Sequence, residues 1–488
     1  MRGIAFHRMT IGLLFVAVVL TACLMPAQSD TYWHLRAGAD IWRTHHVPLV
    51  ETYSHTARGQ FWPNHEWLWQ AFSYAMVRTG GMPLLAAAAA GIVAGAFALA
   101  YRLMVSAPAT RFALMVAGVP ISACVWALRP QIVSLALLAL LVTLLARERY
   151  RWLPLLFVAW ANVHGAVALG GAVLAVTAAA ALVRARSGDP HDQRRALTLT
   201  LLTPLCAAAT ALTPLGPRLW TFIGESIQRS RRTMINEWMP AYPNGPVEIA
   251  FWVLAIGFVV LLVLRWRRLR AWSDVAVVIA AVVVLPLAMR AVRNIPPFLL
   301  LAMPAASRLL GADFRLGRRA ADARTTEEHP RLNLAILVAL ALGGAAVVGV
   351  AWAAPLPRLG WRPLPDGAIA ALRACPGPLY NRYNDGGFVI WFVPETPVFI
   401  DSRQDPYPVD FVLDTVRDDS HATAMTTLAR RGIRCVLLPH DSETLPQLAS
   451  AGWRTRYSDA DWSVVYAPLT PATAAGTARD PAGTPAPR

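Results

Sequence analysis

The sequence predicts a polytopic α-helical membrane protein that ends in a small α/β domain. Hydrophobic residues make up 56% of the 488 residues and charged residues only 15%, and the mean hydropathy is +0.43. A soluble protein of this length carries a larger share of charge. Apolar runs of about 17 to 22 residues recur along the chain, and each is long enough to cross a hydrocarbon core of roughly 30 Å.

Hydropathy windows of about 19 residues place about eleven transmembrane helices within residues 1–353. These predicted spans lie near 9–27, 83–105, 112–128, 131–147, 150–163, 165–184, 196–214, 247–265, 273–289, 292–309 and 332–353. Residues 354–469 alternate short apolar runs with helical stretches, a pattern typical of a small α/β domain. Its strands are expected at 388–393, 397–400, 435–438 and 463–466, and the composition of 470–488 predicts a disordered tail.

The distribution of arginine assigns the loops between the spans to two sides of the membrane. All 45 basic residues are arginines, and they cluster near 102–111, 147–151, 184–195, 265–270 and 308–331. Short loops rich in positive charge usually face the cytoplasm. The large first loop 28–82 and the C-terminal part then lie outside a bacterial inner membrane. Because the net charge of +16 resides in scattered short loops, membrane lipids are expected partners and nucleic acid is not.

Cysteines leave two questions open at this point. Residues 20–23 (LTAC) resemble a lipoprotein processing site, but the apolar run continues through Leu24 and Met25 and favours a first transmembrane helix. Cys375 and Cys435 could form a disulfide if the C-terminal domain is exported, although their spacing alone does not establish the pair.

Polar residues on the external side are the candidates for chemistry, because ionisable groups at a membrane are costly and usually functional. Asp30 follows the first span and could act as a general base or bind a divalent cation; alternatively, water or His34 simply satisfies it. The adjacent residues His65 and Glu66 diverge by about 100° on a helix and cannot form a metal site alone. No metal ligand set is predicted, although a divalent metal is an alternative.

Three external arginines at span ends, Arg129, Arg290 and Arg293, suit a phosphate, which a guanidinium binds through two parallel hydrogen bonds. The alternative is that they extend to lipid headgroups. Further candidates for substrate binding are His34, Asn162, His164 and Asn294. The sequence has no P-loop and no GxGxxG, HExxH or GxSxG motif, so no organic cofactor or cytoplasmic nucleotide is expected.

Several short polar or aromatic segments are distributed over most of the chain. They are 30–35 (DTYWHL) with Gly38, 62–67 (WPNHEW), 160–165 (WANVHG), 212–216 (LTPLG), 293–296 (RNIP), 383–387 (YNDGG) and 399–403 (FIDSR). Together these segments resemble one largely uncharacterised branch of the bacterial GT-C-type membrane glycosyltransferases. That group includes protein mannosyltransferases, oligosaccharyltransferase catalytic subunits and lipopolysaccharide sugar transferases.

This resemblance implies an inverting glycosyltransferase that takes a sugar from a polyprenyl-phosphate donor to a glycan, lipid or protein acceptor outside the membrane. The catalytic acid of the family maps onto Asp30, and its lipid-phosphate contacts suit Arg290 or Arg293. Many members have paired acids in this loop, whereas Thr31 and Tyr32 follow Asp30 here, so Glu66 is the candidate second acid. Two alternatives are a non-catalytic scaffold in envelope polysaccharide assembly and, less favoured by the apolar span centres, a lipid-linked glycan transporter.

Overall fold

The computed structural model describes residues 3–232, 236–312, 314, 329–354, 357–420 and 424–468. The chain divides into two compact units: the first comprises 1–51, 59–363 and 403–409, and the second comprises 52–58, 364–402 and 410–488. The predicted boundary at residue 354 therefore lies nearer Leu364. The reason is that residues 359–360 bond to the segment after the first helix: Ala27 N–H donates to the Leu359 carbonyl (2.8 Å), and the Tyr32 hydroxyl donates to that of Gly360 (2.6 Å). The predicted tail 470–488 lies outside the described residues.

Every predicted span of the first unit contains a helix. They are α1 (Phe6–Cys23), α3 (Trp67–Leu103), α4 (Pro108–Ala123), α5 (Gln131–Ala146), α6 (Leu153–Ala161), α7 (Val167–Ala185), α8 (Pro190–Ala209), α10 (Pro246–Arg265), α11 (Trp272–Arg290), α12 (Ile295–Leu310) and α13 (Pro330–Ala353). Within the described ranges, six helices, namely α1, α3, α7, α10, α11 and α13, are long and apolar enough to cross a membrane on their own. The nine residues of α6 span only about 14 Å. The chain therefore turns back at Asn162 after a short helix.

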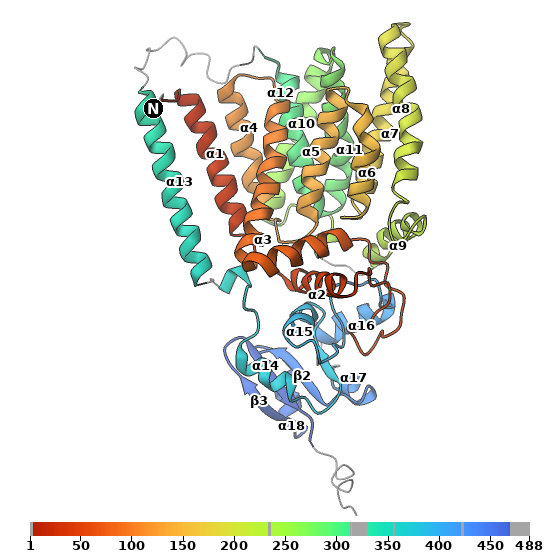
Figure 1. Ribbon diagram of the computed structural model, residues 1–488, viewed down its shortest axis with the longest axis vertical. Coiled ribbons are helices and arrows are strands. Elements are labelled where there is room, and N and C mark those ends of the chain that lie inside the picture. The colour runs from red at the N-terminus through yellow and green to blue at the C-terminus, as the bar shows by residue number, and fades with distance from the viewer. Residues whose placement is uncertain are drawn as a thin grey trace, which may run out of the picture. The chain divides into compact units, whose positions relative to one another are not determined.

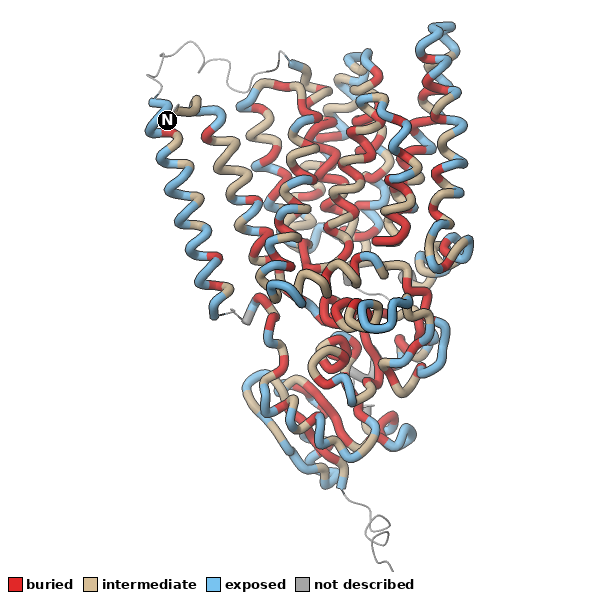
Figure 2. Tube along the Cα trace, viewed as in Figure 1, coloured by how far each residue is buried: buried red, intermediate tan, exposed pale blue. Residues whose placement is uncertain are grey.

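Burial separates the inner helices of the first unit from the outer ones. In Figure 2 the buried positions gather on the central helices, whereas α13 is mostly exposed. In the apolar windows of α3 and α11, 44% of residues are buried, against 11% for α13, whose exposed side chains are nonetheless apolar. Exposed apolar surface on a spanning helix is the surface that contacts lipid.

Two amphipathic helices cover one end of the upright helices. These are α2 (Ser29–Thr44) and the first part of α3, which bends at Gly80 and at Gly81, where φ is 68°. Figure 1 shows both lying crosswise to the spans. Gly38 permits their contact, since a Cβ there would lie 2.1 Å from the Gln70 carbonyl oxygen. The tryptophan-rich segments of the first loop thus form one helical layer.

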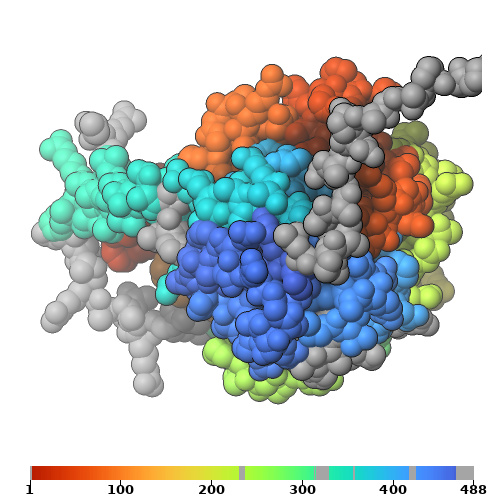
Figure 3. Space-filling model, turned by 90° about the horizontal axis from the view of Figure 1, so that it is seen from below, coloured from red at the N-terminus to blue at the C-terminus, as the bar shows by residue number. Residues whose placement is uncertain are grey.

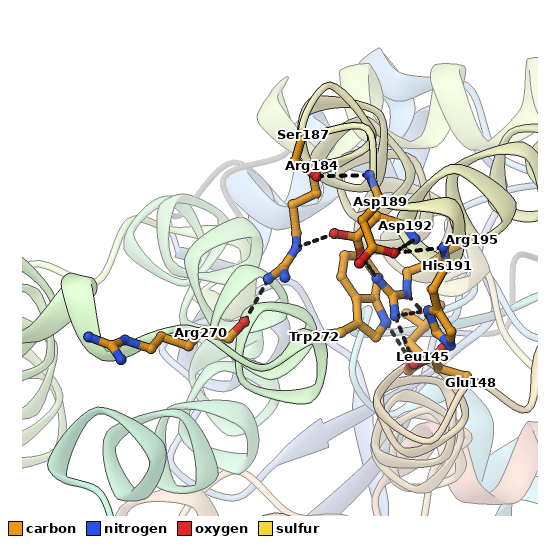
Figure 4. Close-up of polar contacts among 10 residues, drawn as sticks. All are labelled: Leu145, Glu148, Arg184, Ser187, Asp189, His191, Asp192, Arg195, Arg270 and Trp272. Carbon is orange, nitrogen blue, oxygen red and sulfur yellow. Dashed lines mark hydrogen bonds and ion pairs between the residues drawn. The ribbon is translucent and has the colours of Figure 1, made fainter.

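At the opposite end, the arginine-rich loops meet around Arg195, which is 6% exposed (Figure 4). Its guanidinium binds Glu148 at 3.0 Å, pairs with Asp192 and lies over the Trp272 ring at 4.6 Å. Arg184 donates to the Arg270 carbonyl at 2.9 Å. These contacts join the ends of α5, α7, α8 and α11, so the loops that the charge pattern groups together are neighbours in space.

The second unit contains a four-stranded sheet in the order β1 (Leu379–Asn381), β2 (Cys435–Pro439), β4 (Trp462–Tyr466), β3 (Arg454–Ser458). Strand β1 is parallel to β2, and the other pairs are antiparallel. Cys375 and Cys435 form a disulfide. The helices of the second unit are α14 (Asp366–Arg373), α15 (Gly386–Phe392), α16 (Val409–Ser420), α17 (Ala424–Arg430) and α18 (Thr444–Ser450). The first residue of α16, Val409, is assigned to the first unit. In Figure 3 the blue shades of this unit adjoin one another in one body.

Two predicted strands of this unit are wrong. Residues 388–393 belong mainly to helix α15, and residues 397–400 contain one isolated bridge, from Val398 to Ser54. A short apolar run does not distinguish a buried strand from a buried helix. Gly386 decides the outcome here, because it lets α15 begin against the Ile400 carbonyl, only 2.1 Å from where a Cβ would lie.

Replacing Arg195 with Met should lower the stability of the first unit by about 3 kcal/mol, because Asp192 and Glu148 would lose their buried counter-charge. The measurement is the unfolding temperature of the full chain in detergent. The matched control is Arg186→Met, an exposed arginine at the C-terminal end of α7, which should leave that temperature unchanged. Equal unfolding temperatures for the two variants would contradict the stabilising role of Arg195.

Candidate active site

The candidate site forms where the crosswise helices meet the ends of the spans. Asp30 lies in the first turn of α2, whose N-terminus is fixed by a reciprocal capping box between Gln28 and Thr31. Its Oδ1 accepts a hydrogen bond from Trp33 Nε1 at 3.3 Å. The Thr31 hydroxyl donates to the Leu128 carbonyl at 3.1 Å, which brings the loop between α4 and α5 against this turn.

A chain of alternating charges begins at Asp30. Arg129 places Nη1 2.7 Å from Asp30 Oδ2 and Nη2 2.9 Å from Glu237 Oε2. The other oxygen of Glu237 lies 3.5 Å from Arg293 Nη1, and Arg293 lies over the Trp238 ring at 4.2 Å. Burial disfavours the charge on Arg129, but the two carboxylates outweigh it and raise its pKa. We call the four alternating charges of Asp30, Arg129, Glu237 and Arg293 the charge ladder. It holds two paired guanidiniums beside the candidate base.

A second cluster surrounds Glu66, whose side chain is 14% exposed. The Nε2 atoms of His34, His65 and His164 lie 3.6, 3.6 and 3.7 Å from its carboxylate oxygens. Three distant parts of the chain supply these imidazoles: α2, the loop before α3, and the loop between α6 and α7. The structure thus brings four of the predicted site residues together around one carboxyl group.

Burial makes this second cluster predominantly neutral. It raises the pKa of Glu66 to about 8, with the nearby charge of Asp30 acting in the same direction. Burial also lowers the pKa of His34, His65 and His164. At neutral pH, Glu66 is accordingly a carboxylic acid that can donate a proton, and the surrounding imidazoles are uncharged.

Hydrogen bonds orient two of the imidazoles. His65 Nδ1 lies 3.1 Å from the Pro63 carbonyl, which only accepts, so this nitrogen carries the proton and Nε2 presents a lone pair to Glu66. His164 Nδ1 lies 2.8 Å from the Ser134 hydroxyl, which in turn accepts from Trp160 Nε1 at 2.8 Å. Helices α5 and α6 therefore fix the ring of His164.

Three predicted site residues lie apart from these clusters. The Asn162 side chain is fully engaged, accepting from Trp67 Nε1 (2.7 Å) and donating to the Val158 and Leu212 carbonyls. Asn294 donates to the Leu287 carbonyl near the end of α11 (3.0 Å), and Arg290 is exposed at that end. The structure gives both asparagines supporting contacts instead of a place in the clusters.

The histidines and carboxylates of the site carry the atom types that bind metal ions. Among the described residues, no group of three or more His, Cys, Asp or Glu side chains has a geometry that could hold a metal ion. His65 and His164 both approach Oε1 of Glu66, and His34 approaches Oε2.

Comparison with known proteins identifies the fold. No protein-family model and no curated protein matches the sequence. Two solved structures of ArnT from Cupriavidus metallidurans, one bound to undecaprenyl phosphate and one in the apo state, are similar to this chain with TM-scores of 0.52 and 0.53. Each alignment covers 93% of this chain and 97% of ArnT at 14% sequence identity. The chain has the fold of these ArnT structures.

Two acidic residues of the candidate site have no predicted role in the sequence. Glu237 is the centre of the charge ladder; its position in an external loop makes it one of many polar candidates, and it precedes Trp238 as Glu66 precedes Trp67. Asp405 interacts electrostatically with His65, and burial raises its pKa to about 6. No sequence signal connects residues so far apart. Arg403, in the same segment, forms a buried ion pair with Glu51 at 2.5 Å.

The raised pKa of Glu66 predicts a pH-dependent stability. At pH 7 the three histidines are uncharged in the folded chain and about one quarter protonated in the unfolded chain. This offsets part of the effect of folded Glu66, whose proton the unfolded form has lost. Stability should therefore fall by about 1 kcal/mol in total between pH 7 and 9, with most of the fall below pH 8.5. Unfolding temperatures of the full chain at pH 7, 8 and 9 measure this. Glu66→Gln, which resembles the protonated acid, should remove the fall; an identical fall in the variant would contradict the assignment.

Proposed function

We propose that this protein is a membrane glycosyltransferase that moves a sugar from a polyprenyl-phosphate donor to a hydroxyl group of a glycan, lipid or protein acceptor. The single observation that carries the proposal is the placement of Asp30 2.7 Å from Arg129, within a ladder that also contains Arg293. This transfer needs two functions: a base that accepts the proton of the acceptor hydroxyl, and positive groups that stabilise the departing phosphate. A carboxylate next to guanidiniums can supply both.

The fold comparison supports a lipid-phosphate donor. ArnT, which shares the fold, has been solved with undecaprenyl phosphate bound. Arg129 and Arg293 offer two guanidiniums, the groups best suited to phosphate oxygens. Exposed Arg290 remains a proposed contact for the same phosphate or for neighbouring headgroups.

In the proposed reaction, the acceptor oxygen attacks the anomeric carbon of the donor while Asp30 takes the hydroxyl proton. The bond between that carbon and the phosphate oxygen breaks, and the lipid phosphate leaves with the bonding electrons toward Arg129 and Arg293. One direct displacement inverts the configuration of the anomeric carbon. Glu66 and His65 would then contact the acceptor or the sugar, with protonated Glu66 as a hydrogen-bond donor.

The site is proposed to face the outside of the cytoplasmic membrane. The arginine-rich loops lie at the opposite end of the helices, and such loops favour the cytoplasm. The disulfide between Cys375 and Cys435 supports an oxidising location for the second unit. Transport is less well supported, because the hydroxyl of Thr177, near the middle of α7, donates to a carbonyl of its own helix.

Replacing Asp30 with Asn should reduce sugar transfer at least about 100-fold, because the amide cannot accept the hydroxyl proton. Transfer is measured by envelope glycan analysis in a strain that lacks the gene and carries each variant. Asp40→Asn is the matched control on the same helix, where Asp40 pairs with Arg36 at 3.1 Å and with Arg43 at 3.0 Å. Full complementation by Asp30→Asn would support the non-catalytic scaffold instead.

A further inference from the structure

Glu237 occupies the space between the two guanidiniums of the candidate site. Its Oε2 lies 2.9 Å from Arg129 Nη2, and its Oε1 lies 3.5 Å from Arg293 Nη1. Each oxygen of one carboxylate therefore contacts a different arginine. Carboxylate and phosphate present similar acceptor oxygens to a guanidinium, so a lipid phosphate held by this pair would need the same donors.

The backbone around Glu237 is anchored, so that only its side chain needs to move. Glu237 belongs to the short helix η2 (Asn236–Trp238). The Val292 N–H donates to the Met239 carbonyl at 3.1 Å, and the Ala241 N–H donates to the Met289 carbonyl at 3.1 Å. Trp238 supports Arg293 from one face of its guanidinium. A rotation of the Glu237 side chain would expose Arg293 without dismantling its support.

Charge balance gives a reason for this carboxylate to be present. Asp30 and Glu237 together match the charges of Arg129 and Arg293, and an arginine this buried is costly without a partner. Arg129 Nε is also buried and lacks a hydrogen-bond partner among the described residues. An arriving phosphate could therefore replace Glu237 at both guanidiniums and use a further donor.

We propose that Glu237 is a displaceable carboxylate that holds the lipid-phosphate subsite between Arg129 and Arg293 and competes with the bound phosphate. The inference rests on the proposed function, since it presupposes a lipid-phosphate ligand at these arginines. Competition between the Glu237 carboxylate and the bound phosphate would help most in the release of the lipid-phosphate product. A sugar phosphodiester carries one negative charge, whereas the released polyprenyl phosphate carries up to two and would otherwise remain bound between two arginines.

The test is the affinity of the purified full chain for undecaprenyl phosphate, with undecaprenol as the probe that lacks the phosphate. Glu237→Gln keeps the size of the side chain and removes its charge, so the dissociation constant for undecaprenyl phosphate should fall about tenfold. Glu237→Asp keeps the charge on a shorter arm and should give an intermediate value. Glu225→Gln, at an exposed position in α9 (Arg218–Arg232), is the matched control and should bind as the unmodified chain does.

The outcomes separate the inference from the function on which it rests. Equal or weaker phosphate-dependent binding by Glu237→Gln, at an unchanged unfolding temperature, would overturn the role of Glu237 alone. If Glu237→Gln does not fold, tighter binding by Glu237→Asp than by the unmodified chain supports the role, and unchanged or weaker binding overturns it. Equal binding of undecaprenyl phosphate and undecaprenol by the unmodified chain would overturn the proposed donor as well.

Discussion

The Arg129 guanidinium is the interaction on which the geometry of the site depends. It stands in the turn between α4 and α5 and bridges carboxylates from α2 and η2. A charge buried this deeply requires partners on more than one side, since removing either carboxylate leaves the other charges uncompensated. The position of α2 across the ends of the spans is therefore coupled to the position of η2.

Two clusters with opposite electrostatic character lie beside each other in this site. The ladder from Asp30 to Arg293 is charged and suits an anionic leaving group, whereas the group around Glu66 is neutral at pH 7 because burial opposes ionisation. The neighbouring charge of Asp30 adds to that effect on Glu66. One carboxylate thus helps to keep the other protonated, and the two acids acquire different chemical capacities from their surroundings.

Hydropathy and loop charge predict the helices of the first unit well, because each span must be apolar regardless of its neighbours. Placing the site residues required tertiary structure. Arg290 and Arg293 are three residues apart, a spacing that would put them on one helical face. Ala291 adopts an extended conformation (φ −154°, ψ 122°) that ends α11, so only Arg293 reaches the ladder. The ion pairs of Glu237 could not be predicted from the sequence either, since its arginine partners come from separate loops.

The segment 403–409 extends this dependence on tertiary structure to the C-terminal part of the sequence. It belongs to the first unit although residues 364–402 and 410–488 belong to the second. Arg229 on α9 donates to the Gln404 and Tyr407 carbonyls at 3.1 and 2.7 Å. Phe222, two turns earlier on the same face of α9, lies 4.8 Å from the His65 ring. One helix face therefore positions both His65 and the segment that carries Asp405. A site assigned only to residues 1–353, the predicted membrane part of the sequence, would be incomplete.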